Sequence, residues 1–340
     1  MKQSNKRIET IDFLRGSAVL IMLIANTSPY IFQLGNSIFS RYIFSLAAPV
    51  FIFLAGFTAQ MNYERDKPVK LIRTLQILIL AINIDFFIWK SYPLLTFDVL
   101  YLIGFSKLFL IITSRPNNIV YRYIYLATSV LIFIFIKYNI QYRFEIPDLS
   151  FNKLNINFSE YVSKNPIQRM FYDGWFPIFP WFIFFLIGSI FYSIKKMVSI
   201  KTSNILILAS ILLLISLGLN FTQIEVREKY LEVFYPLSGV KLLLPFSVSL
   251  LILGLISRFS NLKISFINLL GKYSLFAYLL NAVLIAILDH FEPERFIILF
   301  KIIALLSIIG IVLAFVYLIN FLKKSNWLQI PNFIKFILGL

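Results

Sequence analysis

The first apolar stretch of the sequence, "RGSAVLIMLIANTSP" at residues 15–29, carries two groups that could bind a ligand. Arg15 and Asn26 are eleven positions apart, a spacing that places both on one face of a helix. At 1.5 Å per residue they are about 16 Å apart along the helix axis, so they could contact the two ends of an elongated molecule. The structural alternatives are an ion pair between Arg15 and Asp12 and an interhelical hydrogen bond from Asn26.

A second polar stripe lies in the stretch "GKYSLFAYLLNAVLIAIL" near the C-terminal end of the sequence. Ser274, Tyr278 and Asn281 are spaced i, i+4 and i+7 and therefore share one helix face. Asn281 is expected at a depth comparable with that of Asn26. Polar groups inside long apolar segments are costly to bury, so they are functional candidates by default.

Acid–base chemistry would need a titratable group near these amides. Asp98 begins an apolar stretch, Asp173 precedes another in "DGWFP", and His290 is the only histidine. A lone loop histidine is more often solvated, although it titrates near neutral pH. For Asp85, at the end of the third stretch, the simplest interpretation is an ion pair with the deeper Lys107.

The elements that must position these residues are transmembrane helices. Of the 340 residues, 59% are hydrophobic and 14% are charged, whereas about a quarter of the residues in soluble domains are charged. Runs of the length that crosses a bilayer are expected at ten places. They are 11–31, 43–61, 71–90, 97–113, 119–137, 175–194, 202–220, 242–257, 272–288 and 297–321. The predicted fold is therefore an all-α, polytopic transmembrane helix bundle of about ten spans, forming a single domain over residues 1–340.

The charge distribution predicts the orientation of the bundle. The net charge is +16, and lysine and arginine are concentrated in the segments on the N-terminal side of the membrane, whereas most acids lie on the other side. The positive-inside rule then places both termini in the cytoplasm, and it explains the charge without a nucleic-acid partner. We expect a multi-pass protein of the cell (inner) membrane, with no cleaved signal peptide.

Other features limit the chemistry and the loops. The absence of cysteine excludes disulfides and thiol nucleophiles, and with a single histidine no metal site is expected. Residues 138–174 are predicted to form a large extracytoplasmic loop. Residues 326–340 are too short to span the membrane after Pro331 and are expected to lie along the inner interface.

Five segments, in order along the chain, carry a resemblance to a known family. They are "RIETIDFLRGSAVLIMLIAN", "FSLAAPVFIFLAGFTAQM", "LLTFDVLYLIGFSKLF", "DGWFPIFPWFIFFLIG" and "LLGKYSLFAYLLN". Together they resemble the heparan-α-glucosaminide N-acetyltransferase-like family of polytopic membrane acyltransferases. The resemblance implies an enzyme that transfers an acetyl group from cytoplasmic acetyl-CoA to a sugar amine or hydroxyl across the membrane. It covers about residues 7 to 285.

The resemblance also implies roles for individual residues. The family's catalytic asparagine follows the glycine of Arg-Gly by ten residues, which is Asn26 here. The family's histidine falls at Ser37, and a histidine common in bacterial relatives falls at Asn281, so both histidines are missing. Asn26 would then position the thioester carbonyl or the acceptor, with Asn281 and Tyr278 in support.

The remaining assignments concern the donor and the base. Arg15 would bind a phosphate of acetyl-CoA. An amide cannot act as a general base, so the base would be Asp98, Asp173 or His290, in that order of preference.

Three classes of function remain open on the sequence. The first is an acyl-CoA-dependent acyltransferase that modifies a glycan or amino sugar. The second is an inactive family member that serves as a scaffold, because the histidines are missing. The third is a permease for a small polar or lipid-linked solute, because buried polar stripes can also line a path. The expected partners are the lipid bilayer, acyl-CoA, the acceptor and, as a further candidate, a second copy in a homodimer.

Overall fold

The computed structural model describes most of the chain. The described residues are 8–32, 42–62, 67–113, 119–139, 165–197, 202–222, 241–259, 261–289, 291, 297–324 and 332–337. Throughout these ranges the chain forms helices joined by turns, and they contain no β-strand. The predicted all-α class is therefore confirmed.

The helices follow the apolar segments closely. In the first half they are α1 (Glu9–Phe32), α3 (Ala47–Met61), α4 (Lys67–Asn83), η1 (Ile84–Ile88), α5 (Val99–Thr113) and α6 (Ile119–Asn139). In the second half they are α8 (Pro166–Gln168), η2 (Arg169–Asp173), α9 (Ile178–Met197), α10 (Thr202–Thr222), α11 (Leu243–Arg258), α12 (Ser265–Lys272), α13 (Ser274–Asp289), α14 (Ile298–Lys324) and α15 (Asn332–Ile337). Nine of the ten predicted segments overlap mainly with one of these helices, and the segment 71–90 covers most of α4 and all of η1.

Length and composition identify a multi-pass membrane protein. Within the described residues, six helices are long and apolar enough to cross a bilayer, and the number rises to eight if two bent helix pairs each count as one span. α5 and α11 are shorter apolar helices. The count of ten spans and the cytoplasmic termini stay predictions.

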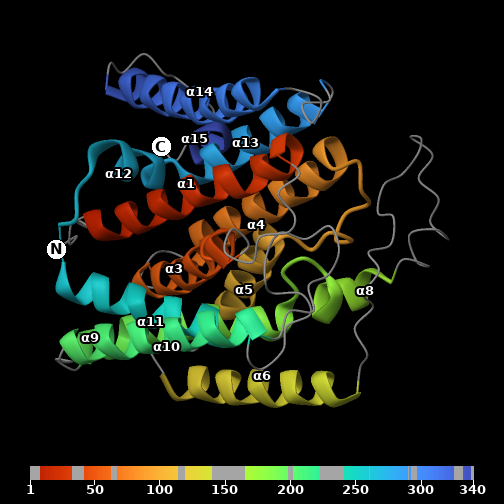
Figure 1. Ribbon diagram of the computed structural model, residues 1–340. Coiled ribbons are helices and arrows are strands. Elements are labelled where there is room, and N and C mark those ends of the chain that lie inside the picture. Colours follow the sequence, from red (N-terminus) through yellow and green to blue (C-terminus); the bar gives the residue numbers. More distant parts are fainter. Residues whose placement is uncertain are drawn as a thin grey trace.

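The outer helices expose apolar surface. α14 and α6 form opposite edges of the bundle (Figure 1), and both expose large side chains such as Leu306, Phe321, Leu131 and Phe135. In water such surfaces would be expensive, whereas lipid tails solvate them well. The most buried helices, α3 and α9, lie between these edges, so polar groups needed for function can be shielded there.

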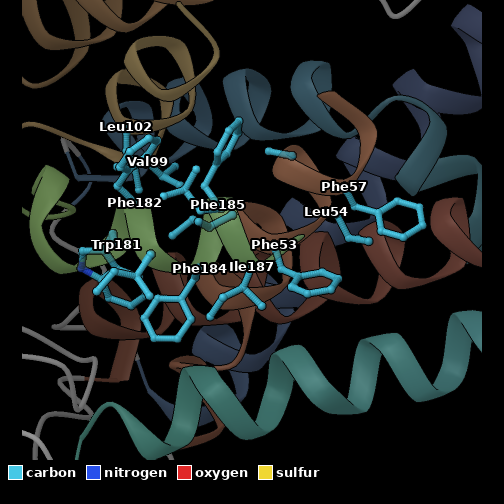
Figure 2. Close-up of a cluster of buried hydrophobic side chains, with 14 of the residues drawn as sticks. Phe53, Leu54, Phe57, Val99, Leu102, Trp181, Phe182, Phe184, Phe185 and Ile187 are labelled. Atoms are coloured by element: carbon cyan, nitrogen blue, oxygen red, sulfur yellow. The ribbon is translucent and has the colours of Figure 1, made fainter. Parts of the chain in front are cut away.

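α3 and α9 pack closely at two glycines. A Cβ atom added at Gly56 would lie 1.9 Å from the carbonyl oxygen of Phe185, and one added at Gly188 would lie 2.1 Å from that of Phe53. Small residues permit such close backbone contact between transmembrane helices. Figure 2 shows the side chains around this contact, including Phe53, Phe185 and Trp181, which are fully buried.

α12 and α13 form a bent pair with an angle of 84° between them. α12 lies along α1, where a Cβ atom added at Gly271 would lie 1.7 Å from the carbonyl oxygen of Asp12. Asn268 holds the start of α12, because its Nδ2 donates to the Glu9 oxygen at 2.9 Å and its Oδ1 accepts from the Ile264 amide at 2.9 Å. The bend directs α13 away from this anchor. α12 extends the ninth predicted segment at its N-terminal end.

Two loops from distant parts of the chain are joined by backbone hydrogen bonds. The amide of Trp175 donates to the Thr96 oxygen at 2.7 Å, and the amide of Phe176 donates to the Phe97 oxygen at 2.9 Å. In the first loop, Leu94 and Phe97 have φ angles of 70° and 41°, in the left-handed region that is unfavourable for bulky residues. Such strain is often found at functional sites.

Two predicted segments, the loop 138–174 and the C-terminal segment 326–340, consist mainly of residues that the structure does not describe. Residues 140–164 of the predicted loop 138–174 are not described, while residues 138–139 belong to α6 and residues 166–173 are helical. The extent of that loop stays a prediction. In the segment 326–340 only α15 is described, and its interfacial position stays a prediction.

Candidate functional site

Asp98 and Tyr278 meet although they are 180 residues apart in the sequence. Asp98 directly precedes α5, and its Oδ1 accepts from the Val99 amide at 2.6 Å. A negative charge at a helix start is favoured by the helix dipole. Its Oδ2 accepts a hydrogen bond from the Tyr278 hydroxyl of α13. The Asp98 side chain is buried. Two residues predicted separately as site candidates are thus in direct contact.

Asn281 lies one helical turn beyond Tyr278 on α13. Its side chain is only 1% exposed, and within the described part of the chain neither its Oδ1 nor its Nδ2 has a hydrogen-bond partner. A buried polar group without a partner costs about 1–3 kcal/mol. An amide kept there at that cost, beside a carboxylate–tyrosine pair, is well suited to hydrogen-bond a substrate.

Asp85 forms a second carboxylate centre close to the first. It lies in η1, and its Oδ1 accepts from the Thr96 hydroxyl at 2.6 Å. Its Oδ2 accepts from the Tyr101 hydroxyl at 2.8 Å and from the Leu94 amide at 3.2 Å. Asp98 is near enough to act on it electrostatically.

The prediction that Asp85 pairs with Lys107 is wrong. η1 is a π-helical turn, and with the loop that follows it directs the carboxylate to Thr96 and Tyr101 instead. Lys107 lies near other positive charges, those of Arg15 and Arg73. Sequence reasoning missed Thr96 and Tyr101, although Tyr101 follows Asp98 by three residues and so shares its helix face.

The positive charges gather at the opposite end of the same helices. The charge of Lys107 on α5 interacts with those of Arg15 on α1 and Arg73 on α4. Nη2 of Arg15 donates to Oγ1 of Thr58 at 3.1 Å. Along α5, Lys107 lies roughly 13 Å from Asp98. Under the predicted orientation, this cationic group faces the cytoplasm. An anion such as a phosphate would be attracted to these positive charges.

The remaining predicted residues are placed less directly. Asn26 is half-buried on α1, which packs against α13. Asp173 is buried at the end of η2, and Nη1 of Arg169 donates to its backbone oxygen at 2.9 Å. It directly precedes the segment 174–176 that is bonded to Thr96 and Phe97. His290 and Ser37 lie outside the described residues.

The comparison with known families decides the identity of the chain. Residues 7–220 match the family described as heparan-alpha-glucosaminide N-acetyltransferase, catalytic. The chain belongs to this family. Membership indicates a membrane acetyltransferase-like function. In general, members of this family use acetyl-CoA as the acetyl donor. No match was found among curated proteins.

The family match covers one side of the site. Arg15, Asn26, Asp85 and Asp98 lie within the matched residues, from α1 to α5. Tyr278 on α13 and its neighbour Asn281 lie beyond residue 220. The contact between Asp98 and Tyr278 therefore joins the part of the chain that matches the family to the part that does not.

Proposed function

We propose that this protein is a transmembrane acyltransferase that moves an acetyl or other short acyl group from cytoplasmic acyl-CoA to an amine or hydroxyl of an extracytoplasmic glycan. The observation that carries the proposal is the Asp98–Tyr278 pair beside Asn281, whose amide has no hydrogen-bond partner among the described residues. A positioned base and a hydrogen-bond donor for the developing negative charge are two kinds of group that accelerate acyl transfer.

In the proposed reaction, Asp98 accepts the proton of the acceptor amine or hydroxyl. The acceptor then forms a bond to the acyl carbon, the carbon–sulfur bond breaks, and the proton passes to the leaving thiolate. Tyr278 holds the Asp98 carboxylate through its hydroxyl hydrogen bond. A positioned base of this kind contributes about 10² to 10⁴ fold to the rate. Asp98 would thus take the role of the family's histidine, whose position is occupied by Ser37 in this chain.

Asn281 and Asn26 orient the reacting groups in this proposal. The Nδ2 of either amide can donate to the oxygen that becomes negative as the acceptor attacks. Removal of one such donor typically lowers kcat by about 10² to 10³ fold. The role of Asn281 is supported by its amide, which has no hydrogen-bond partner among the described residues. The role of Asn26 is supported by its place on α1, which packs against α13.

The cationic group formed by Arg15, Arg73 and Lys107 fits the donor. Acyl-CoA carries several phosphates at one end and the thioester at the end of a long arm. The separation of roughly 13 Å between Lys107 and Asp98 along α5 lies within the reach of such an arm. Guanidinium groups such as those of Arg15 and Arg73 suit phosphates especially well.

The test uses purified protein in liposomes with acetyl-CoA and a panel of amino sugars and sugar alcohols. We expect acceptor-dependent release of free thiol, reduced about 100-fold or more by Asp98→Asn. Glu9→Gln is the matched control, because it also converts a carboxylate to an amide but at an exposed ion pair with Lys263. Absence of acceptor-dependent thiol release across the panel would overturn the proposal. Sugar uptake without thiol release would instead support the permease.

A further inference from the structure

Asp85 is a buried carboxylate that the proposed reaction does not use. Its side chain is 1% exposed and lies in a membrane helix segment, where an ionisable group is expensive to place. η1, which carries it, is a π-helical turn, an irregularity that is frequent at functional sites.

The partners of Asp85 lie on both sides of Asp98 in the sequence. Thr96 precedes Asp98 by two residues and Tyr101 follows it by three, and each donates its hydroxyl to one oxygen of Asp85. The Leu94 amide donates to the same oxygen as Tyr101. The Asp85 carboxylate thus connects the strained loop before Asp98 to the first turn of the helix after it.

Both oxygens of Asp85 accept hydrogen bonds, Oδ1 from Thr96 and Oδ2 from Tyr101 and Leu94. Asp85 and Asp98 lie close enough for their charges to interact, and two like charges in a buried region destabilise the fold. An asparagine at position 85 could accept on one oxygen only, and its amide N–H groups would face the donors on the other side. A carboxylate is therefore the group that can hold the residues on both sides of Asp98 at once.

We propose that Asp85 is a positioning residue that holds Asp98 against Tyr278 and keeps its carboxylate in the orientation that receives the acceptor proton. This inference rests on the proposed function. Asp85 does not touch the reacting atoms and acts only through Asp98. In the proposed function the phosphate end of the donor binds at Arg15, Arg73 and Lys107, so Asp85 has no part in binding that end.

The first test is a comparison of two acceptors. We expect Asp85→Asn to lower kcat for an amino sugar or sugar alcohol about tenfold and to leave the KM for acetyl-CoA unchanged. Hydroxylamine is unprotonated at neutral pH and needs no base. Its acetylation, corrected for the protein-free rate, should therefore be unchanged in Asp85→Asn. A general loss of structure would lower both reactions equally, and that result would overturn the inference.

The second test is a double-mutant cycle. If Asp85 acts through Asp98, then Asp85→Asn should cause no further loss in the Asp98→Asn background, because coupled residues are not additive. A full, additive tenfold loss in the double variant would overturn the inference and leave the proposed function intact. If Asp85→Asn fails to fold, Tyr101→Phe removes one of its bonds and should show the same selectivity between acceptors. A native protein that transfers nothing overturns the proposed function and this inference together.

Discussion

Replacing Asn281 by leucine should make the protein more stable and less active. In the described structure the side-chain oxygen and nitrogen of Asn281 are both buried without partners, and each such group costs about 1–3 kcal/mol. Leucine has a similar volume, and shape changes of this kind usually cost less than about 1.5 kcal/mol. The net expectation for Asn281→Leu is a gain of about 2 kcal/mol in the free energy of unfolding. Stability of this kind is commonly given up at functional sites.

The same substitution at Asn268 is the matched control. Its amide makes three hydrogen bonds, to the backbone oxygens of Glu9 and Leu262 and from the amide of Ile264. Asn268→Leu leaves these groups without their partner and should therefore lower stability, by about 1–3 kcal/mol. The same change from asparagine to leucine is thus expected to raise the free energy of unfolding at position 281 and to lower it at position 268 of the bent pair α12–α13.

The assay is thermal unfolding of the purified variants in detergent, together with thiol release from acetyl-CoA. We expect Asn281→Leu to unfold at a higher temperature than the native protein and to lose about 100-fold in kcat. A lower unfolding temperature for Asn281→Leu would show that the amide stabilises the bundle. A higher unfolding temperature with full activity would show that the amide has no part in the reaction. Either result would refute the reasoning.

Two further predictions concern helix packing and donor binding. Gly188→Ala should lower the free energy of unfolding by about 1–3 kcal/mol, because its Cβ would lie 2.1 Å from the Phe53 oxygen. Gly218→Ala, whose Cβ meets nothing within 4 Å among the described atoms, should be neutral or stabilising by up to about 1 kcal/mol. Thermal unfolding of both variants checks this pair. Arg15→Ala should raise the KM for acetyl-CoA about tenfold with kcat nearly unchanged, because it removes uniform binding of the donor. A fall in kcat with an unchanged KM would contradict that role.

The helices could be predicted from the sequence because their signal is local. Each apolar stretch of suitable length became a helix, since the backbone in lipid must satisfy its own hydrogen bonds. The bend at Tyr273 was missed, because the hydrophobic pattern continues through it and only the packing of α12 on α1 requires it.

The site was predictable as a set of residues and not as a set of contacts. Asp98, Tyr278 and Asn281 were expected because polar groups in apolar segments are costly. Their proximity depends on how α5 and α13 pack, which no local pattern reveals. The error at Asp85 has a similar cause, because a π-helical turn has no clear sequence signature and it changes the direction of the side chain. Lys107 is consequently affected by the charge of Arg15, while Asp85 is hydrogen-bonded by Thr96 and Tyr101.

The contact between Asp98 and Tyr278 also has a consequence for how the protein is made. Ribosomes add about 5–20 residues per second, so the 180 residues between the two side chains correspond to about 10–40 s of synthesis. Asp85 meets Thr96 and Tyr101 within one short stretch of chain, and its hydrogen bonds can form as soon as that stretch enters the membrane. Asp98 must wait for α13. During biogenesis the Asp98 carboxylate of the nascent bundle therefore lacks its hydrogen bond from Tyr278, which forms only after α13 has been inserted.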